Sequence, residues 1–397
     1  MWGAAGSPHQ TEGNNTNSDW WAWEHSQGRM NALKKEGKNP ESYFSGIACD
    51  SYNRFEEDFS LAEHLNHNAA RFGVEWARVE PKQGEYSEAA LDHYEKVLQS
   101  AKAHGLQTFV TLHHFSSPMW FMKLGGFEKR ENVDLFVKYA QKVAERLGQY
   151  VDFWITINEP IIYSSHSYYF RKYPPCKKSF LATYRVTQNL ISAHNKTFAK
   201  LHSVSNTPVS VCNQLPNIEA MGFISRPLRF IAKYLATEYI ITRTINQCDF
   251  IAVNYYVRKR VGWFGIVKSK YKEEEISDLG WHLYPSGLEK VLLDLKKYNK
   301  PVYITENGLA DAQDNRREKY IKDHLFYVHK AIEQGVDVRG YLYWSLIDNF
   351  EWDEGFGPRF GLVEIDRENL LRRKVRFSAT KYAEICRNNQ MEYEVTE

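Results

Sequence analysis

Cysteine is scarce in this sequence and shows no pairing pattern. There are five cysteines, an odd number, and none forms a CxxC motif or lies at a zinc-ligand spacing from a histidine. This dispersion is typical of a protein from a reducing compartment and gives no sign of a structural zinc site. We therefore expect a cytoplasmic protein without a metal.

Long apolar runs and an excess of one charge are also missing. No stretch approaches the roughly 18 apolar residues that a membrane-spanning helix needs, and no apolar signal-peptide core follows Met1. The 51 Lys and Arg nearly balance the 49 Asp and Glu, so the basic surface of a nucleic-acid-binding protein is not expected. We thus expect neither a membrane nor a nucleic-acid partner, and the oligomeric state stays open.

Nucleotide-binding and metalloenzyme motifs are absent as well. No GxGxxG or GxxxxGK[ST] follows an early predicted strand, and there is no HExxH. We therefore expect no cofactor. Aromatic residues, in contrast, make up 15% of the chain, which suits either core packing or rings that line a carbohydrate site.

The strongest positive signal is an alternation of apolar runs with helical patterns. Eight short runs rich in β-branched and aromatic residues predict strands, at 2–5, 69–76, 107–114, 151–158, 208–214, 249–256, 301–307 and 340–348. Amphipathic segments separate them, at 55–65, 94–101, 136–147, 179–203, 226–246, 286–298, 321–332 and 377–388. Eight β-then-α units predict an α/β fold, a (β/α)8 TIM barrel formed as one domain by residues 1–397. An open doubly wound sheet is the alternative.

Two long irregular stretches, 11–54 and 257–285, each follow a predicted strand. In a barrel both would be βα loops on the catalytic face, where long loops usually shape the substrate pocket.

Polar side chains gather at the predicted carboxyl ends of the strands, where barrel enzymes place their active sites. Glu159 and Glu306 each end an apolar strand beside an asparagine, and Arg71 lies within the second strand. One such glutamate would more simply cap a helix, but two of them with an arginine in the same ring indicate a carboxylate pair. Adjacent strand residues point to opposite faces, so only one of His113 and His114 can face the pocket.

Two carboxylates without a metal or cofactor motif suit glycoside hydrolysis. One must be protonated to serve the leaving oxygen and the other ionised to attack the anomeric carbon, so their pKa values must differ. Arg71 and a tyrosine hydroxyl beside one carboxylate would keep it ionised, whereas an apolar wall would keep the other protonated. The residues alone do not decide between retention and inversion.

Motifs of high specificity occur in order along nearly the whole chain. They include WGAAGSPHQTEG (2–13), ARFGVEWARVEP (70–81), ITINEP (155–160), YITENGLAD (303–311) and YLYWSLIDNFEWDEGFGPRFGL (341–362). With these motifs the chain resembles the β-glycosidases of glycoside hydrolase family 1. The resemblance implies a (β/α)8 barrel, a small-molecule β-glycoside substrate of the β-glucosidase type, and a retaining double displacement.

The resemblance also implies roles for the strand-end residues. Glu159 of the NEP motif is similar to the acid/base, and Glu306 of the TENG motif to the nucleophile. Asn158 would bind the sugar 2-hydroxyl, a contact that strengthens in the transition state. Arg71 and Tyr256 would orient the nucleophile and keep it ionised.

Asn254, by the same resemblance, would support the nucleophile end of the site. A carboxylate at Glu351 would accept bonds from sugar hydroxyls and repel a phosphate, which implies non-phosphorylated substrates. It would tolerate either epimer at O4, so glucosides, galactosides and fucosides stay open. The residues implied to contact the sugar are Gln10, His114, Trp344, Glu351, Trp352 and Phe360.

Four functions are weighed against these residues. The first is an exo-acting β-glycosidase with some transglycosylation. The second is a non-catalytic carbohydrate-binding barrel, which the presence of both Glu159 and Glu306 disfavours. The third is a 6-phospho-β-glycosidase, which Glu351 disfavours, and the fourth is a metal-dependent hydrolase, for which no ligand cluster is found.

Overall fold

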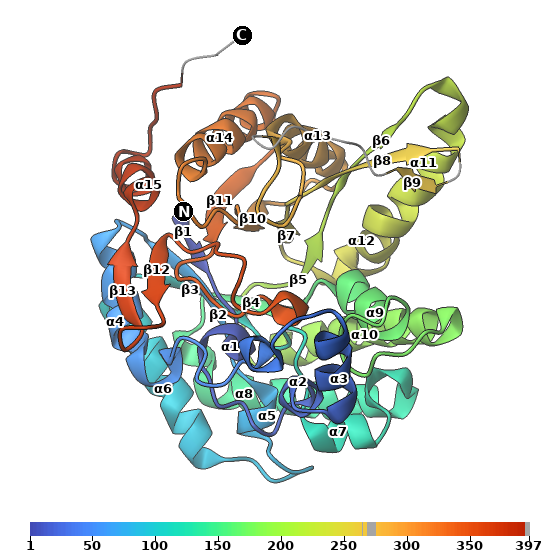
Figure 1. The fold of residues 1–397 in the computed structure, drawn as a ribbon, viewed down its shortest axis with the longest axis vertical. Helices are drawn as coiled ribbons and strands as arrows, with labels where there is room; N and C mark the ends of the chain where they lie inside the picture. Colours follow the sequence, from blue (N-terminus) through green and yellow to red (C-terminus); the bar gives the residue numbers. More distant parts are fainter. Residues whose placement is uncertain (264, 268–274, 394–397) are drawn as a thin grey trace.

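Eight parallel strands close into a barrel in this computed structural model, which describes residues 1–263, 265–267 and 275–393 (Figure 1). Around the barrel the order is β1 (Trp2–Ala5), β11 (Val338–Trp344), β10 (Val302–Asn307), β7 (Ile251–Asn254), β5 (Val209–Gln214), β4 (Phe153–Asn158), β3 (Gln107–Thr111) and β2 (Ala69–Gly73). Every neighbouring pair is parallel. The predicted (β/α)8 barrel is confirmed.

Some predicted strands were too long at their carboxyl ends. The second, third and eighth runs were expected to continue to 76, 114 and 348, but the strands end at Gly73, Thr111 and Trp344. The residues that follow are still buried, except the half-buried Leu346, although they have left the ladder. Hydrophobicity therefore marks burial at the barrel mouth and not the end of strand pairing.

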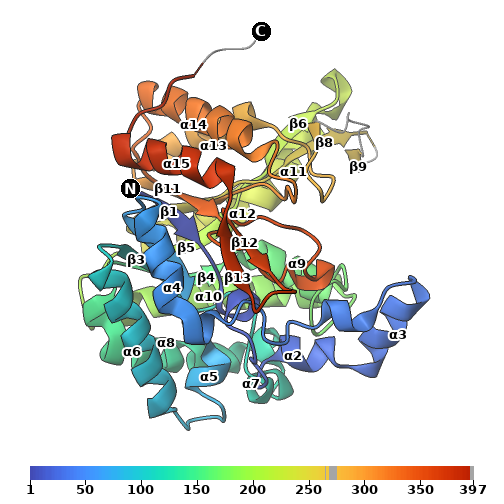
Figure 2. The same cartoon turned by 60° about the vertical axis from the view of Figure 1, so that its left-hand side comes forward.

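The predicted helical segments surround the barrel (Figure 2). They are α4 (Ser51–His64), α6 (Glu88–Ala103), α8 (Val133–Leu147), α10 (Phe180–His202), α11 (Arg226–Lys233), α12 (Tyr239–Thr244), α13 (Pro285–Leu295), α14 (Arg317–Glu333) and α15 (Phe377–Asn388). In α8 the side chains of Phe136, Ala140, Val143 and Leu147 are buried, one face of a 3.6-residue period. No helix among the described residues is long and apolar enough to cross a bilayer.

The two long loops contain more regular structure than expected. The loop at 11–54 holds α2 (Asp19–Glu24), α3 (Gln27–Lys35) and the 3-10 turn η1 (Pro40–Tyr43). The stretch 257–285 holds β8 (Arg258–Gly262) and β9 (Gly265–Val267), which join β6 (Asn217–Ala220) in a small sheet. Residues 264 and 268–274 of that predicted loop lie outside the described part of the chain. The remaining elements that the site uses are α1 (Pro8–Thr11), α9 (Pro160–Tyr168), β12 (Val363–Asp366) and β13 (Arg372–Val375).

Aromatic rings fill the amino-terminal half of the barrel. Phe109 of β3 stacks on Phe153 of β4 with ring centroids 4.3 Å apart, and Tyr303 of β10 lies 5.4 Å from Phe109. Phe250, just before β7, packs against the same group at 5.3 Å from Tyr303. This plug closes one end of the barrel, so the polar strand ends are left to form a pocket at the other.

Candidate active site

Two buried glutamates line one cavity at the carboxyl ends of the strands. Glu159 directly follows β4 and adopts a left-handed backbone conformation with φ of 45°. Glu306 lies in β10, where the pairing with β7 shifts in register beside it. Both carboxyl groups line a cavity of about 730 Å³. The structure thus brings together the two residues that the strand-end pattern singled out.

Glu306 is held by a cation and a hydroxyl. A guanidinium nitrogen of Arg71 contacts Oε1 of Glu306, and the hydroxyl of Tyr256 donates to Oε2 at 2.7 Å. Burial and the charge of Glu306 raise the pKa of Tyr256 well above its usual range, so this hydroxyl stays a donor. Hydrogen bonds and an opposite charge on a carboxylate favour its ionised form. Glu306 therefore has the surroundings of an anionic nucleophile.

Glu159 has the opposite surroundings. Its burial, and then the negative charge of Glu306, raise its pKa to about 8. The side chain makes no cap bond to α9, so the simpler explanation as a helix cap does not apply. Its Oε1 accepts one hydrogen bond, of 2.6 Å, from Nδ2 of Asn254. The resemblance implied that Asn254 supports the nucleophile end of the site. In the structure its amide donates to Glu159, while its Oδ1 accepts a hydrogen bond of 2.9 Å from Thr305, the residue before Glu306.

Asn158 connects the two carboxylate environments. Its Oδ1 accepts hydrogen bonds from Arg71 at 2.7 Å and from Asn254 at 3.2 Å. Its Nδ2 lies 3.1 Å from Nε2 of His114. Burial, followed by the charge of Arg71, lowers the pKa of His114 well below its usual range, so the neutral ring can accept this bond. His113 points away, to the helix layer, where Nε2 lies 3.1 Å from Oγ of Ser117.

Gln10 and Glu351 form a polar corner of the same cavity. Nε2 of Gln10 donates to the carbonyl of Phe350 at 2.8 Å and lies 3.4 Å from Oε2 of Glu351. Burial, then the charges of Asp353 and Glu306, raise the pKa of Glu351 to about 8. This corner offers both a donor and acceptor oxygens to a sugar hydroxyl.

Aromatic rings form the walls next to this corner. The ring of His114 lies between those of Trp344 and Trp352, with centroids 5.9 and 6.1 Å away. Phe360 and Trp281 also line the cavity, with their ring centroids 6.1 Å apart. Flat apolar surfaces beside hydroxyl-binding groups are suited to a pyranose ring.

Part of the cavity wall was not assigned from the sequence. Trp281 follows β9, Lys259 lies in β8, and Lys172 and Tyr173 follow α9, all in segments after barrel strands. Their position in βα loops was the available signal, but nothing in their spacing shows that they face inward. Lys172 lies 3.6 Å from Asp353, and burial lowers the pKa of Lys259. Lys172 and Lys259 make one side of the cavity basic.

Metal ligation has no evident place in the site. Across residues 1–263, 265–267 and 275–393, no group of three or more His, Cys, Asp and Glu side chains is arranged to hold a metal ion.

Known proteins resemble this chain over nearly its whole length. The profile of the family described as "Glycosyl hydrolase family 1" matches residues 1–222 and 233–391. Beta-glucosidase A of Thermotoga maritima is 30% identical over 447 aligned residues, covering 99% of this chain and 98% of that protein. "Galactolipid galactosyltransferase SFR2, chloroplastic" of Arabidopsis thaliana is 30% identical, covering 91% of this chain and 62% of that protein. The solved β-glycosidase from Pyrococcus horikoshii superposes with a TM-score of 0.88 at 37% identity, covering 98% and 94%.

Proposed function

This chain belongs to glycosyl hydrolase family 1, and on that premise we propose that it is a retaining, exo-acting β-glycosidase for non-phosphorylated β-D-glycosides. Its membership and its β-glucosidase relatives make it a glycoside hydrolase with a glycoside as substrate. The observation that carries the finer proposal is the contrast between the two carboxylates. Glu306 is bound by Arg71 and Tyr256, whereas the pKa of Glu159 is raised to about 8.

In the first step the ionised Glu306 attacks the anomeric carbon. The bond from that carbon to the glycosidic oxygen breaks, and Glu159 gives its proton to the departing oxygen. The sugar is then bound covalently to Glu306 and the aglycone leaves as an alcohol. Arg71 and Tyr256 fix the carboxylate beside the sugar without a covalent role of their own.

In the second step Glu159 acts as a base. Once Glu306 is esterified it carries no charge, and the repulsion that helped to raise the pKa of Glu159 is gone. Glu159 then takes a proton from a water molecule, whose oxygen attacks the anomeric carbon and releases Glu306. Two inversions restore the original configuration.

Substrate choice follows from Glu351 and Gln10. Glu351 lines the cavity, where its oxygens can accept bonds from sugar hydroxyls and its ionised form would repel a phosphate dianion, which supports glucosides, galactosides and fucosides over 6-phosphosugars. An alcohol can replace water in the second step, and the relative named a galactosyltransferase supports such transfer to acceptors.

The test is a panel of nitrophenyl β-glucoside, β-galactoside, β-fucoside, β-mannoside and 6-phospho-β-glucoside. We expect turnover of the first three, with the β-anomer as the first product seen by proton NMR. An α-anomer as first product would contradict retention. Preference for the phosphorylated sugar would contradict the role of Glu351, and no turnover at all would favour the carbohydrate-binding alternative.

A further inference from the structure

Helix α11 turns apolar side chains toward solvent. None of its eight residues is buried, and Phe230 and Ile231 are 64% and 58% exposed. Tyr234 and Leu235, in the following turn of π-helix η6 (Tyr234–Glu238), continue the same row one turn later and are also exposed. We call Phe230, Ile231, Tyr234 and Leu235 the outer stripe. In a surface helix such a stripe normally faces the core.

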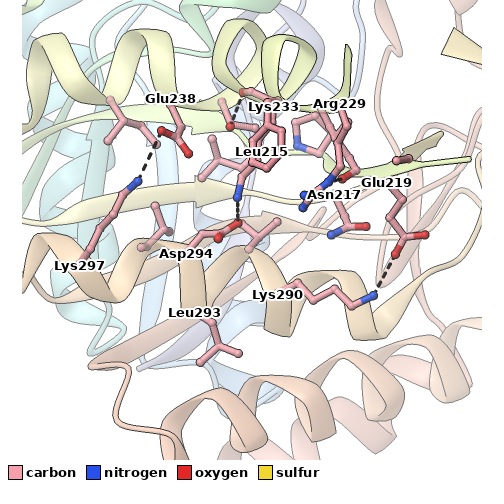
Figure 3. Close-up of a pocket in the computed structure, with 18 of the residues that line it drawn as sticks. Leu215, Asn217, Glu219, Arg229, Lys233, Glu238, Lys290, Leu293, Asp294 and Lys297 are labelled. Atoms are coloured by element: carbon pink, nitrogen blue, oxygen red, sulfur yellow. Dashed lines mark hydrogen bonds and ion pairs between the residues drawn. The ribbon is translucent and has the colours of Figure 1, made fainter. Parts of the chain in front are cut away.

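The charged face of the same helix is turned to the protein. Figure 3 shows Arg229 and Lys233 pointing into a cavity of about 860 Å³ that α13 borders on the other side. Lys233 forms an ion pair of 2.5 Å with Asp294 of α13, and Nε of Arg229 donates to the carbonyl of Ile218 at 2.8 Å. These contacts fix the rotation of α11. Phe230 lies at the edge of the outer stripe and also borders the cavity, whereas Ile231, Tyr234 and Leu235 do not line it.

Two further aromatic residues extend the apolar surface. Phe223, before α11, is 77% exposed, and Trp263, between β8 and β9, is 62% exposed. The backbone N–H of Met221 donates to the carbonyl of Val261 at 2.9 Å, so the segments that follow β6 and β8 leave the small sheet at the same end, at the right of Figure 1. Residues 223–232 also lie between the two ranges that match the family. Phe223, Phe230 and Ile231, half of the six apolar residues of this surface, thus lie outside the shared family pattern.

The charge around the outer stripe has one sign. Residues 221–237 contain three basic residues and no Asp or Glu. Only Arg226 of the three is exposed, since Arg229 and Lys233 point into the cavity. Arg226 is exposed, with its guanidinium 4.9 Å from the ring centre of Phe223. A second copy of this chain, docked stripe to stripe, would bring Arg226 of each copy to a surface that has no acid in 221–237 to pair with it. An anionic lipid surface offers both apolar volume and negative charge.

We propose that the outer stripe, with Phe223 and Trp263, docks this protein on the surface of an anionic lipid bilayer. α11 would lie in the plane of the interface, with its aromatic residues among the headgroups and Arg226 at the anionic lipids. The expectation of no membrane partner rested on the lack of a spanning segment, which this mode of binding does not need. The proposal stands independently of the catalytic function.

The docking surface adjoins the catalytic cavity. Lys259 of β8 and Val267 of β9 line that cavity, while Trp263 lies between the same two strands. Docking through this surface would therefore bring the basic wall of the cavity close to the lipid headgroups.

The experiment is flotation of the full-length chain with vesicles of phosphatidylcholine alone or mixed with phosphatidylserine. We expect the wild type to bind the mixed vesicles. F230S/I231S/L235S should reduce partitioning at least about tenfold, because burial of a single such side chain in the bilayer contributes about a factor of ten. The control is L370S/F377S, which replaces two residues that are 91% and 64% exposed. Leu370 lies just before β13 and Phe377 begins α15, two elements that Figure 1 shows on the side away from α11. It should bind like the wild type.

Two further variants test the same surface without altering the outer stripe. F223S/W263S should also weaken binding to the mixed vesicles, whereas Arg226→Gln should reduce it only to the level seen with phosphatidylcholine alone. Hydrolysis of a soluble nitrophenyl glycoside should persist in every variant, which reports folding and separates this proposal from the catalytic one. Absence of vesicle binding by the wild type would overturn the proposal. So would equal loss in the control, or a dimer in light scattering that F230S/I231S/L235S dissociates.

Discussion

The side-chain amide of Asn254 lies 2.6 Å from Oε1 of Glu159, and this bond joins β7 to the end of β4. A hydrogen bond to a carboxylate favours the ionised form and so lowers the pKa. Here burial and the charge of Glu306 outweigh it, and the pKa of Glu159 rises to about 8. Asn254 therefore limits how tightly Glu159 holds its proton, which matters because the proposed mechanism needs this residue both as acid and as base.

Replacing Glu306 by alanine should remove the proposed nucleophile. We expect hydrolysis of an aryl β-glucoside to fall by several orders of magnitude, since no other carboxylate in the described part of the chain is bound by both Arg71 and Tyr256. Azide should then restore turnover from the vacated side and yield an α-glycosyl azide, which NMR identifies. Unchanged hydrolysis, or a β-azide product, would show that Glu306 is not the nucleophile.

The Glu159→Gln variant should discriminate between leaving groups. A dinitrophenyl leaving group needs little protonation, so its glycosylation step should be nearly normal, whereas a phenyl or alkyl glucoside should be slowed by about 10²-fold or more. A plot of log(kcat/KM) against leaving-group pKa should become steeper than that of the wild type. If both kinds of substrate slow by the same factor, Glu159 does not donate the proton.

The pH profile should show the raised pKa of Glu159. A group with a raised pKa keeps its proton to higher pH, so kcat/KM for a poor leaving group should fall as the pH rises through about 8. Asn254→Ala removes the bond that lowers this pKa, and the falling limb should move to higher pH. A limb that moves to lower pH would contradict the assignment of Asn254 to Glu159.

Glu351 should link sugar binding to stability. Its folded pKa is raised from 4.5 to about 8 by burial and then by the charge of Asp353. The folded state therefore favours the neutral carboxyl, and the free energy of unfolding should fall as the pH rises from 4.5 to about 8. Glu351→Gln stays neutral, and above pH 8 it should unfold at a higher temperature than the wild type. Its KM for a β-glucoside should rise by roughly tenfold, because the amide replaces an acceptor oxygen.

The matched control for this prediction is Glu333→Gln, on an exposed part of α14. It should change neither the KM nor the pH dependence of unfolding measured by calorimetry. A Glu351→Gln variant that loses stability with pH in parallel with the wild type would contradict the burial effect.

Lys259 should favour an anionic aglycone. Its side chain lines the basic side of the catalytic cavity, where an ion pair with a substrate carboxylate would be partly shielded from water. Lys259→Met should reduce kcat/KM for a carboxyphenyl β-glucoside by roughly tenfold relative to neutral phenyl β-glucoside. Lys319→Met, exposed on α14, is the control and should leave the ratio of the two substrates unchanged.

The barrel and the carboxylate pair were predictable because both depend on local pattern. A run such as VDFWITIN is apolar on both faces, which only a strand covered by barrel and helices tolerates. Because barrel enzymes have their active sites at the carboxyl ends of the strands, Glu159 and Glu306 were then expected at the same mouth of the barrel. The opposite directions of His113 and His114 were also expected from strand geometry, and they hold although the strand itself ends at Thr111.

The partner of Asn254 was not predictable. Its strand, β7, lies next to β10 in the barrel and pairs Asn254 with Glu306 across a shift in register, yet its amide donates to Glu159. Register depends on contacts between segments far apart in the chain. The inward direction of Lys172 and Lys259 escaped prediction for the same reason, because loop conformation depends on the walls against which the loop packs.

Local sequence thus determined which segments are strands or helices and which side chains share one face of each, since those periods are set by the backbone. Segment 226–246 illustrates the limit of such information. Its pattern predicts a helix with an apolar stripe and a basic face, and the usual rule puts the stripe inside. The ion pair of Lys233 with Asp294, on a helix roughly sixty residues away, turns α11 the other way. Burial and charge come from neighbours, and only the tertiary structure brings those neighbours together.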